Sequence, residues 1–484
     1  MAASFDLTTI DALARHFKEP AWLTDLRHKA FETQQQLPWP HPSDEIWRRT
    51  DVSLLDPMRG FLPRPPSLFE SLSLKEAHLS LFTQPLGEEQ LFVRVNGTWL
   101  AQPQISGWLI EDVADVAQMG KQGDWIRKFL ETDGLSQTEQ KLTHLNLAFH
   151  DDALSIQIPD DFIGSVPIRL IHALSMAPSQ ALFPMTIIRV GKGSSVTWVD
   201  EYLSLPESGM SLSASQASAE TTEAHLVNSR IELVLEKDAR VHYVRLQRWD
   251  IQAREFLLLR ATLGRGAQLT LANLNLGSSL SKTHLITKLM EEQASSFLYG
   301  FTFGKRNQHI DQHTLQDHQA PHTSSDLKVR AALQDKSRMI YTGLIRIAQS
   351  AQQTNAFQEN HNLLLSENTQ AETIPMLEIL ADDVQCKHGA SIGPIDEEQI
   401  FYAMARGVPR AVAERLVVMG FVEPIIAQVP FEPLRQRLRQ EIEGELHGWG
   451  AGGDKIADCG LEQNPKSEIK NVPHAPFPTP PTYG

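Results

Sequence analysis

The sequence predicts a mainly β protein with helical regions at both ends. Helical spacing of apolar residues dominates residues 1–155 and returns after residue 393. The stretch between them, 156–393, consists of short runs rich in Val, Ile, Leu and Tyr, separated by Gly, Lys, Asp or Ser. Because no long helical pattern interrupts these runs, we expect the centre of the chain to be one β structure.

The strand region contains a weak repeat. A polar turn precedes an alternating run in "KGSSVTWV", "KDARVHYV", "RGAQLTLA", "EQASSFLY" and "DKSRMIYT", which aligns Val196, Val241, Leu269, Phe297 and Met339. A second strand precedes each of the later copies. A pair of strands per repeat indicates either the coils of a β-solenoid or a β-sandwich with regular hairpins. The absence of Asn-Gly turns from this region favours the solenoid.

The N-terminal region, 1–155, is expected to form a mostly helical domain. The stretch Leu7–Leu37 has apolar residues at helical spacing, and Thr8 or Thr9 is the expected N-cap. The stretch Asp124–Asp152 is also predicted to be helical.

The C-terminal domain, 394–446, is predicted to hold three helices. Asp396 is expected to cap the first helix, Gly407 to end it, and Gly420 to end the second. Residues 447–484 are rich in Gly and Pro and lack apolar periodicity, so we expect a disordered tail there.

Charge and hydropathy exclude several classes of function. A net charge of −15 repels phosphate backbones, so we do not expect nucleic acid as a partner. No run reaches the ~18 apolar residues that a membrane helix needs. The stretch Met1–Phe17, with Asp6 and Asp11, fits neither a secretory signal nor a transit peptide. We therefore expect a cytoplasmic protein without membrane contacts.

Two further kinds of site lack the residues they need. The stretch Leu276–Thr283 lacks the glycines of a phosphate loop, so we expect no nucleotide to bind this chain. The two cysteines, Cys386 and Cys459, are too few for a disulfide framework or for a conventional cluster held by four thiolates. Their scarcity fits a reducing compartment.

Four histidines form the first candidate metal site: His309, His313, His318 and His322. Histidines four apart on a strand share a face, so two pairs could ligate a metal in a stand-alone metal-binding enzyme. The alternative is a partly solvated strand that displays polar side chains on one face. The spacing of known zinc signatures is missing.

The stretch Ala381–Gly393, "ADDVQCKHGASIG", holds the second candidate site. On an extended strand Cys386 and His388 point to the same face, as two metal ligands must. Lys387 or a protonated His388 would lower the pKa of the thiol and favour thiolate. A buried cysteine acting as a small hydrophobe is the alternative. Because nothing local supplies an oxyanion hole, a partial metal set completed by another subunit fits better than a nucleophile.

These residues resemble a known family. The stretches Asp317–Ser366 and Pro375–Phe421 are similar to the SufB/SufD family of iron–sulfur cluster assembly proteins. The sequence "CKHGASIG" resembles the SufD branch, because the SufB equivalent usually reads His-Glu-Ala. The stretch Asp44–Leu55, "DEIWRRTDVSLL", is similar to the N-terminal signature of SufD, with Arg49 in place of a tyrosine.

The resemblance implies a fold and an assembly. The fold would be a right-handed parallel β-helix over 156–393 between helical terminal domains, which selects the solenoid. The chain would be a non-catalytic SufD-like scaffold subunit. It would pair with a SufB-like paralogue through the β-helix and with a SufC-like ATPase through 394–446. A homodimer is possible when the chain is alone.

The resemblance also implies a site. Cys386 and His388 would face the SufB interface and hold a nascent iron–sulfur cluster or iron transiently, while the partner supplies the essential thiolate. The neutral imidazole of His388 is the better candidate ligand, whereas Cys386 is either a second ligand or packing. Gly389 would permit close approach of a partner backbone. In the alternative, a solenoid adaptor without metal chemistry, neither Cys386 nor His388 would matter.

Overall fold

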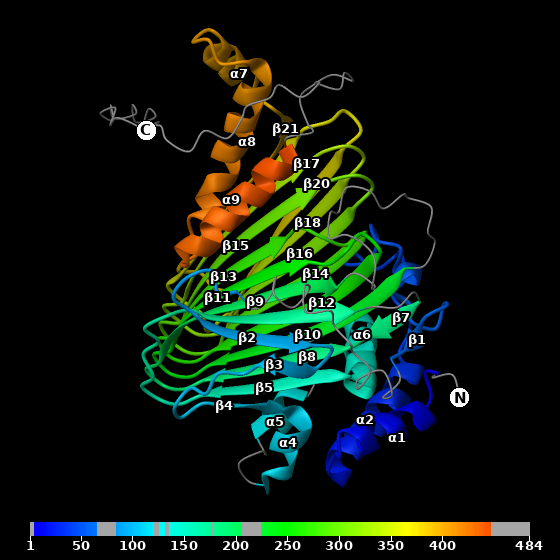
Figure 1. Ribbon diagram of the computed structural model, residues 1–484. Coiled ribbons are helices and arrows are strands. Elements are labelled where there is room, and N and C mark those ends of the chain that lie inside the picture. Colours follow the sequence, from blue (N-terminus) through cyan, green and yellow to red (C-terminus); the bar gives the residue numbers. More distant parts are fainter. Residues whose placement is uncertain are drawn as a thin grey trace.

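The computed structural model describes residues 4–64, 84–120, 125–130, 135–175, 179–205 and 224–446. Its centre is a parallel β-solenoid made of two sheets (Figure 1). From β8 onward, successive strands alternate between the sheets, so each turn of the chain adds one strand to each sheet. The predicted fold class, mainly β with helices at both ends, is confirmed. The predicted tail at 447–484, with Cys459, lies outside the described residues.

Both sheets run the length of the solenoid, and parallel pairing dominates them. In spatial order, sheet 1 contains β20 (Gln370–Ile379), β18 (Arg338–Ile347), β16 (His309–His318), β14 (Leu280–Leu289), β12 (Ala253–Leu263), β10 (His225–Leu235), β8 (Pro184–Val190), β5 (Asp152–Ile158) and β4 (Leu109–Asp112), with β7 (Gln180–Leu182) beside β10 and β1 (Leu62–Pro63) beside β7. Sheet 2 contains β21 (Val384–Pro394), β19 (Thr354–Leu364), β17 (Ser324–Leu333), β15 (Ser295–Gly304), β13 (Gln268–Asn275), β11 (Arg240–Arg248), β9 (Ser195–Leu205), β6 (Ile168–Ser175), β2 (Gln90–Val95) and β3 (Thr98–Ala101).

The parallel register builds columns of equivalent residues along the solenoid. The first three residues of the predicted alignment do pair with one another on β9, β11 and β13. Leu269 pairs with Ser296 rather than Phe297, and Met339 lies on β18 in the other sheet. The last two members of the alignment were therefore wrong. The alignment failed because, in both sheets, a polar turn precedes a strand with alternating apolar and polar residues, so the sequence pattern does not distinguish the two sheets.

The interior between the two sheets is a continuous hydrophobic cluster. One inward column of sheet 2 contributes five of its members, none more than 1% exposed: Trp198, Tyr243, Leu271, Leu298 and Leu327. Burying one such side chain stabilises a fold by ~1.5–3 kcal/mol. The stacked columns thus hold successive turns together.

The N-terminal helices pack on the outward face of sheet 1. They are α1 (Leu7–His16), α2 (Ala21–Gln36), the 3₁₀ helix η1 (Val52–Leu55), α4 (Val113–Gln118), α5 (Trp125–Leu130) and α6 (Gln137–Phe149). Phe149 and Leu145 of α6 join Phe256 and Leu258 of β12 in one cluster. Asp6 caps α1 by accepting a hydrogen bond from the backbone N–H of Thr9 at 2.8 Å, so the predicted cap was wrong.

Residues 90–112, within the region expected to be mostly helical, form β2, β3 and β4. Asn96 and Gly97 join β2 to β3 with φ of 48° and 84°, the left-handed pair that a tight hairpin requires. Trp99 and Trp108 pack against the interior cluster. The strands that the sequence reasoning missed therefore cover the first end of the solenoid.

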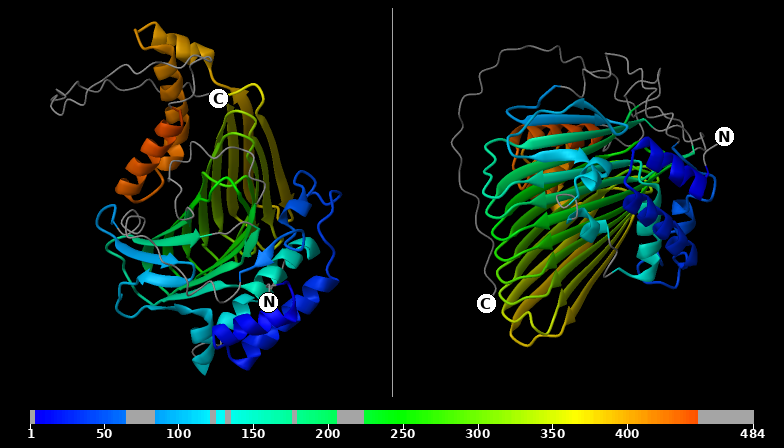
Figure 2. Two further views of the ribbon diagram at one scale, coloured as in Figure 1. Left: turned by 45° about the vertical axis from the view of Figure 1, so that its right-hand side comes forward. Right: turned by 90° about the horizontal axis from the view of Figure 1, so that it is seen from below.

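Two C-terminal helices, α8 (Arg410–Ile426) and α9 (Glu432–Leu446), pack on the outward face of sheet 2, on a different side from the N-terminal helices (Figure 2). The shorter α7 (Glu397–Met404) precedes them and packs against α8. Asp396 caps α7 as predicted. Contrary to the prediction, α8 continues past Gly420 and Pro424, because its buried residues Val418 and Val422 pack with sheet 2. Within the described ranges, no helix is long and apolar enough to cross a membrane.

Candidate functional site

Cys386 and His388 lie on β21, in the last turn of the solenoid. Cys386 pairs with Ala356 of β19, and His388 pairs with Gln358. Ala356 and Gln358 are only 2% and 1% exposed because they point into the interior. Parallel pairing in register gives Cys386 and His388 the same orientation. The thiol and the imidazole therefore share a face, as predicted, and that face is the interior side.

The last turn is nevertheless open to solvent. β20 and β21 are the outermost strands of the two sheets at this end. His388 is exposed and Cys386 is half-buried. Leu377 and Ile392, which also lie on these two strands, are 38% and 42% exposed. Unpaired strand edges with exposed apolar side chains are a template for pairing with another chain.

Burial raises the pKa of the Cys386 thiol above its usual value. The thiol packs against a small cluster that includes Ile345 and Ala356. The expected activation by Lys387 fails because Lys387 pairs with Phe357 on the outward side of the sheet. At neutral pH Cys386 is therefore a protonated thiol, which must lose its proton before it can bind a metal.

Two histidines of the other candidate site face outward from β16. His309 Nε2 lies 3.1 Å from Oγ1 of Thr50, and His313 Nε2 lies 2.9 Å from Oδ1 of Asp311. Burial lowers the pKa of both imidazoles, that of His313 to about 4. These side chains lie against the N-terminal region, where they are neutral at pH 7.

His318 faces the interior instead. Its Nδ1 lies 2.8 Å from Oγ1 of Thr323, and its Nε2 lies 2.9 Å from Oγ of Ser325. His322 follows in a turn, with φ of 58°. Among the described residues, no group of three or more His, Cys, Asp or Glu side chains could hold a metal ion. The structure does not bring the four histidines together, so it gives no support to the stand-alone metalloenzyme.

The stretch Leu276–Thr283 forms a turn that leads into β14. A phosphate loop instead leads into a helix, whose N-terminal N–H groups face the phosphate. The stretch therefore lacks both the glycines and the following helix of a phosphate loop.

An exposed apolar surface on α7 escaped the sequence reasoning. Phe401, Tyr402 and Met404 are 72%, 61% and 42% exposed, and we call these three residues the α7 surface. Figure 1 shows α7 beyond the last turn of the solenoid. The signal was present in "IFYAM", five consecutive residues that are mostly apolar, of which only Ile400 is buried. Such clustering on a free surface marks an interaction site.

A buried ionic cluster holds α9 on sheet 2. Glu201 of β9 accepts hydrogen bonds from Arg437 at 2.7 Å, Arg248 at 2.8 Å and Arg169 at 3.0 Å. Burial alone would raise the pKa of Glu201, but the three guanidinium groups outweigh it and lower the pKa to about 2. Since Arg437 belongs to α9, this ionic cluster fixes α9 to β9 of sheet 2.

Comparison with known proteins decides the family. The family model for the SufBD core domain of SUF-system FeS cluster assembly matches residues 172–421, which is more than half of the 484 residues. The chain belongs to the SufB/SufD family. The matched region includes Cys386 and His388, and the resemblance seen in the sequence is confirmed.

Curated members of the SufB/SufD family are similar over most of their length. The iron–sulfur cluster assembly protein SufD of Bacillus subtilis is 25% identical over 466 residues, which are 92% of this chain and 98% of that protein. A SufBD family protein of Synechocystis sp. is 26% identical over 430 residues, 87% of this chain and 91% of that protein. Another, of Staphylococcus saprophyticus, is 25% identical over 311 residues, 64% of each chain.

Proposed function

We propose that this chain is a SufD-like scaffold subunit of a cytoplasmic, ATP-driven SUF complex and that it is not itself an enzyme. The observation that carries the proposal is the open last turn, which presents Cys386 and His388 at an unpaired edge of both sheets. The sequence "CKHGASIG" and the similarity to a SufD over 98% of its length support the SufD assignment.

A SufB-like paralogue would pair with β20 and β21. Ideal Cβ atoms at Gly389 and Gly393 would have no neighbour within 4 Å, so the backbone of β21 is open to close approach. The test is light scattering of the chain mixed with a SufB-like paralogue. Ile392→Lys should abolish the heterodimer, whereas Thr98→Lys on the opposite end of the solenoid should not. If the wild-type chain stays monomeric in the mixture, the proposal is contradicted. A homodimer that forms without the paralogue and is replaced by the heterodimer in the mixture agrees with the proposal.

Cys386 and His388 would supply part of a transient site for the nascent cluster, which is the cargo of the complex. Cys386 and His388 place two donors on one face, and among the described residues no third His, Cys, Asp or Glu joins them to complete a metal site. This arrangement fits half of a metal site. His388→Ala should abolish cluster formation, measured by visible absorbance of the reconstituted complex, while light scattering shows the complex intact. An unchanged cluster yield would remove the ligand role. Cys386→Ala then tests the role of the thiol: a lower cluster yield indicates a second ligand, and an unchanged yield indicates packing.

A SufC-like ATPase would dock on residues 394–446 through the α7 surface. Phe401→Ser should remove the ATPase from the complex on size exclusion and leave pairing with the SufB-like paralogue unchanged. Gln440→Ser on α9, also an exposed position, is the matched control. If Phe401→Ser retains the ATPase at wild-type affinity, the α7 surface is not the docking site.

A further inference from the structure

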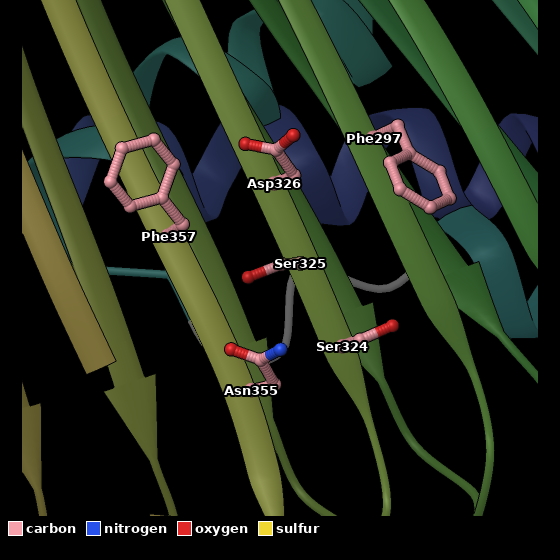
Figure 3. A pocket seen from close by; sticks show the side chains of 6 residues that line it. All are labelled: Phe297, Ser324, Ser325, Asp326, Asn355 and Phe357. Carbon is pink, nitrogen blue, oxygen red and sulfur yellow. The ribbon is translucent and has the colours of Figure 1, made fainter. Parts of the chain in front are cut away.

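Three residues form a row across neighbouring strands of sheet 2. Phe297 of β15 pairs with Asp326 of β17, which pairs with Phe357 of β19. The residues preceding Asp326 and Phe357, Ser325 and Ala356, are buried on the inward side, so the row faces outward. Figure 3 shows the carboxylate of Asp326 between the two rings.

The row lines a pocket of about 360 Å³, together with Ser324, Ser325 and Asn355. The backbones of the two phenylalanines are separated by two strand spacings, roughly 9.6 Å. Asp326 lies on the strand midway between them, so its carboxylate is flanked by one ring on each side. The pocket therefore offers a ligand one carboxylate between two aromatic side chains.

The carboxylate of Asp326 is incompletely compensated. Its Oδ1 is buried and accepts no hydrogen bond from the part of the chain that the structure describes, while its Oδ2 lies 3.4 Å from Nζ of Lys328. The side chains of Lys328 and Asp326 are 37% and 30% exposed, so this ion pair contributes little and can be displaced. Rotation about the Cβ–Cγ bond turns either oxygen toward the pocket. A donor from a ligand would satisfy an acceptor that the chain leaves empty.

Packing of the chain itself does not account for the two rings. Tyr299 and Phe301, further along β15, pack with the cluster beneath the C-terminal helices. Phe297 and Phe357 lie outside that cluster and stay half-buried. Each ring therefore keeps part of its surface open to a ligand in the pocket.

We propose that this pocket binds a guanidinium group, carried by an arginine side chain of a partner protein or by a small guanidine compound. The planar cation lies over the row, contacts the rings of Phe297 and Phe357 and donates N–H bonds to Asp326, displacing Lys328. An ammonium group is not planar, so it cannot lie flat against a ring. The net charge of −15 attracts cations to the chain. This site is separate from the scaffold role and does not depend on it.

The first experiment uses the full chain and saturation-transfer NMR. The probes are Nα-acetyl-arginine amide and a pentapeptide with one central arginine, each against its citrulline counterpart, which has the same shape without the charge. Both arginine probes should bind at least about tenfold more tightly than the citrulline probes. A tighter pentapeptide assigns the site to a partner's side chain, and a tighter free amide assigns it to a small compound. Equal binding of arginine and citrulline probes, or no binding, overturns the proposal.

The second experiment uses variants of the pocket. Asp326→Asn should weaken the arginine probes about tenfold, and Phe357→Leu should weaken them several-fold while keeping an apolar side chain. Lys328→Met should strengthen binding, because it removes the competing cation; this gain keeps the test valid if another variant fails to fold. Glu367→Gln, in the exposed turn after the other end of β19, is the control and should change nothing. Wild-type affinity in Asp326→Asn contradicts the proposal.

Discussion

The two ends of the solenoid differ in how they are finished. At the first end, β3 and β4 run antiparallel to their neighbours, and Trp99 and Trp108 pack over the interior cluster. At the last end, β20 and β21 stay parallel to their neighbours, and Leu377 and Ile392 stay exposed. Aromatic side chains thus cover the interior at the first end, whereas the last end leaves apolar side chains open to solvent.

One inward column spans both ends. It runs from Gln90 on β2 through Ile168 and Trp198 and reaches His388 on β21 through residues paired in register. Trp198 is 1% exposed, whereas His388 is exposed. The same position of the repeat is buried on β9 and open to solvent on β21, because the neighbours along the axis of the solenoid differ.

The largest expected effect on stability is the difference between truncating Trp198 and truncating His388. Trp198→Ala should lower the free energy of unfolding by about 3–5 kcal/mol, because it leaves a cavity in the interior. His388→Ala should change it by less than about 0.5 kcal/mol, because solvent already surrounds the side chain. Urea unfolding of both variants measures the difference. Similar losses in the two variants would mean that the last turn is covered in the isolated chain.

A second comparison concerns charge. Glu201→Gln should lower the free energy of unfolding by about 3 kcal/mol, because it leaves three arginines around a neutral group. Glu378→Gln on β20 should cost less than about 0.5 kcal/mol, because its partner Arg346 and Glu378 itself are 37% and 51% exposed. Urea unfolding at pH 7 measures both. Equal losses would contradict the distinction between the buried and the open end.

The carboxylate of Glu201 also makes the free energy of unfolding depend on pH. The pKa of Glu201 is about 2 in the folded chain against 4.5 ordinarily, so the folded state binds the proton less readily. Its contribution to stability is fully present above pH 4.5 and is lost as pH falls from 4.5 toward 2. The stability difference between wild type and Glu201→Gln should therefore shrink across this window. A difference that stays constant down to pH 2 would show that Glu201 has an ordinary pKa.

The smallest expected effect is on thiol chemistry at the last end. In a Cys459→Ser background, alkylation of Cys386 by iodoacetamide should be slow at pH 7 and should rise about tenfold per pH unit up to pH 9, because burial raises the thiol pKa. Pairing with a SufB-like paralogue should slow the reaction further. A rate that levels off below pH 8 would indicate an activated thiolate instead.

The sequence was informative for two local features. Alternation along "VQCKHGAS" correctly placed Cys386 and His388 on one face, and Asp396 was correctly identified as a helix cap. Alternation cannot say which face is the interior or which turn is last, because both depend on strands far along the chain. The exposure of His388 follows only from the stacking of β19 and β21.

Other features were missed because tertiary packing outweighed local preference. Gly420 and Pro424 suggest a break, yet α8 runs through both positions, since its neighbours are buried on sheet 2. The Asn96–Gly97 turn was a readable hairpin signal, but it lies in a region dominated by helical patterns. The alignment placed Met339 in the wrong sheet because the two kinds of strand share one pattern.

The difference between the ends also sets an order in time. Each turn of the solenoid lies on the one before it, so a chain that leaves the ribosome N-terminus first can close its first end while later turns are still being translated. β20 and β21 are made after every other strand of the solenoid. The last two strands therefore form only after the earlier turns on which they rest, and they precede the helices α8 and α9 that pack on the outward face of sheet 2.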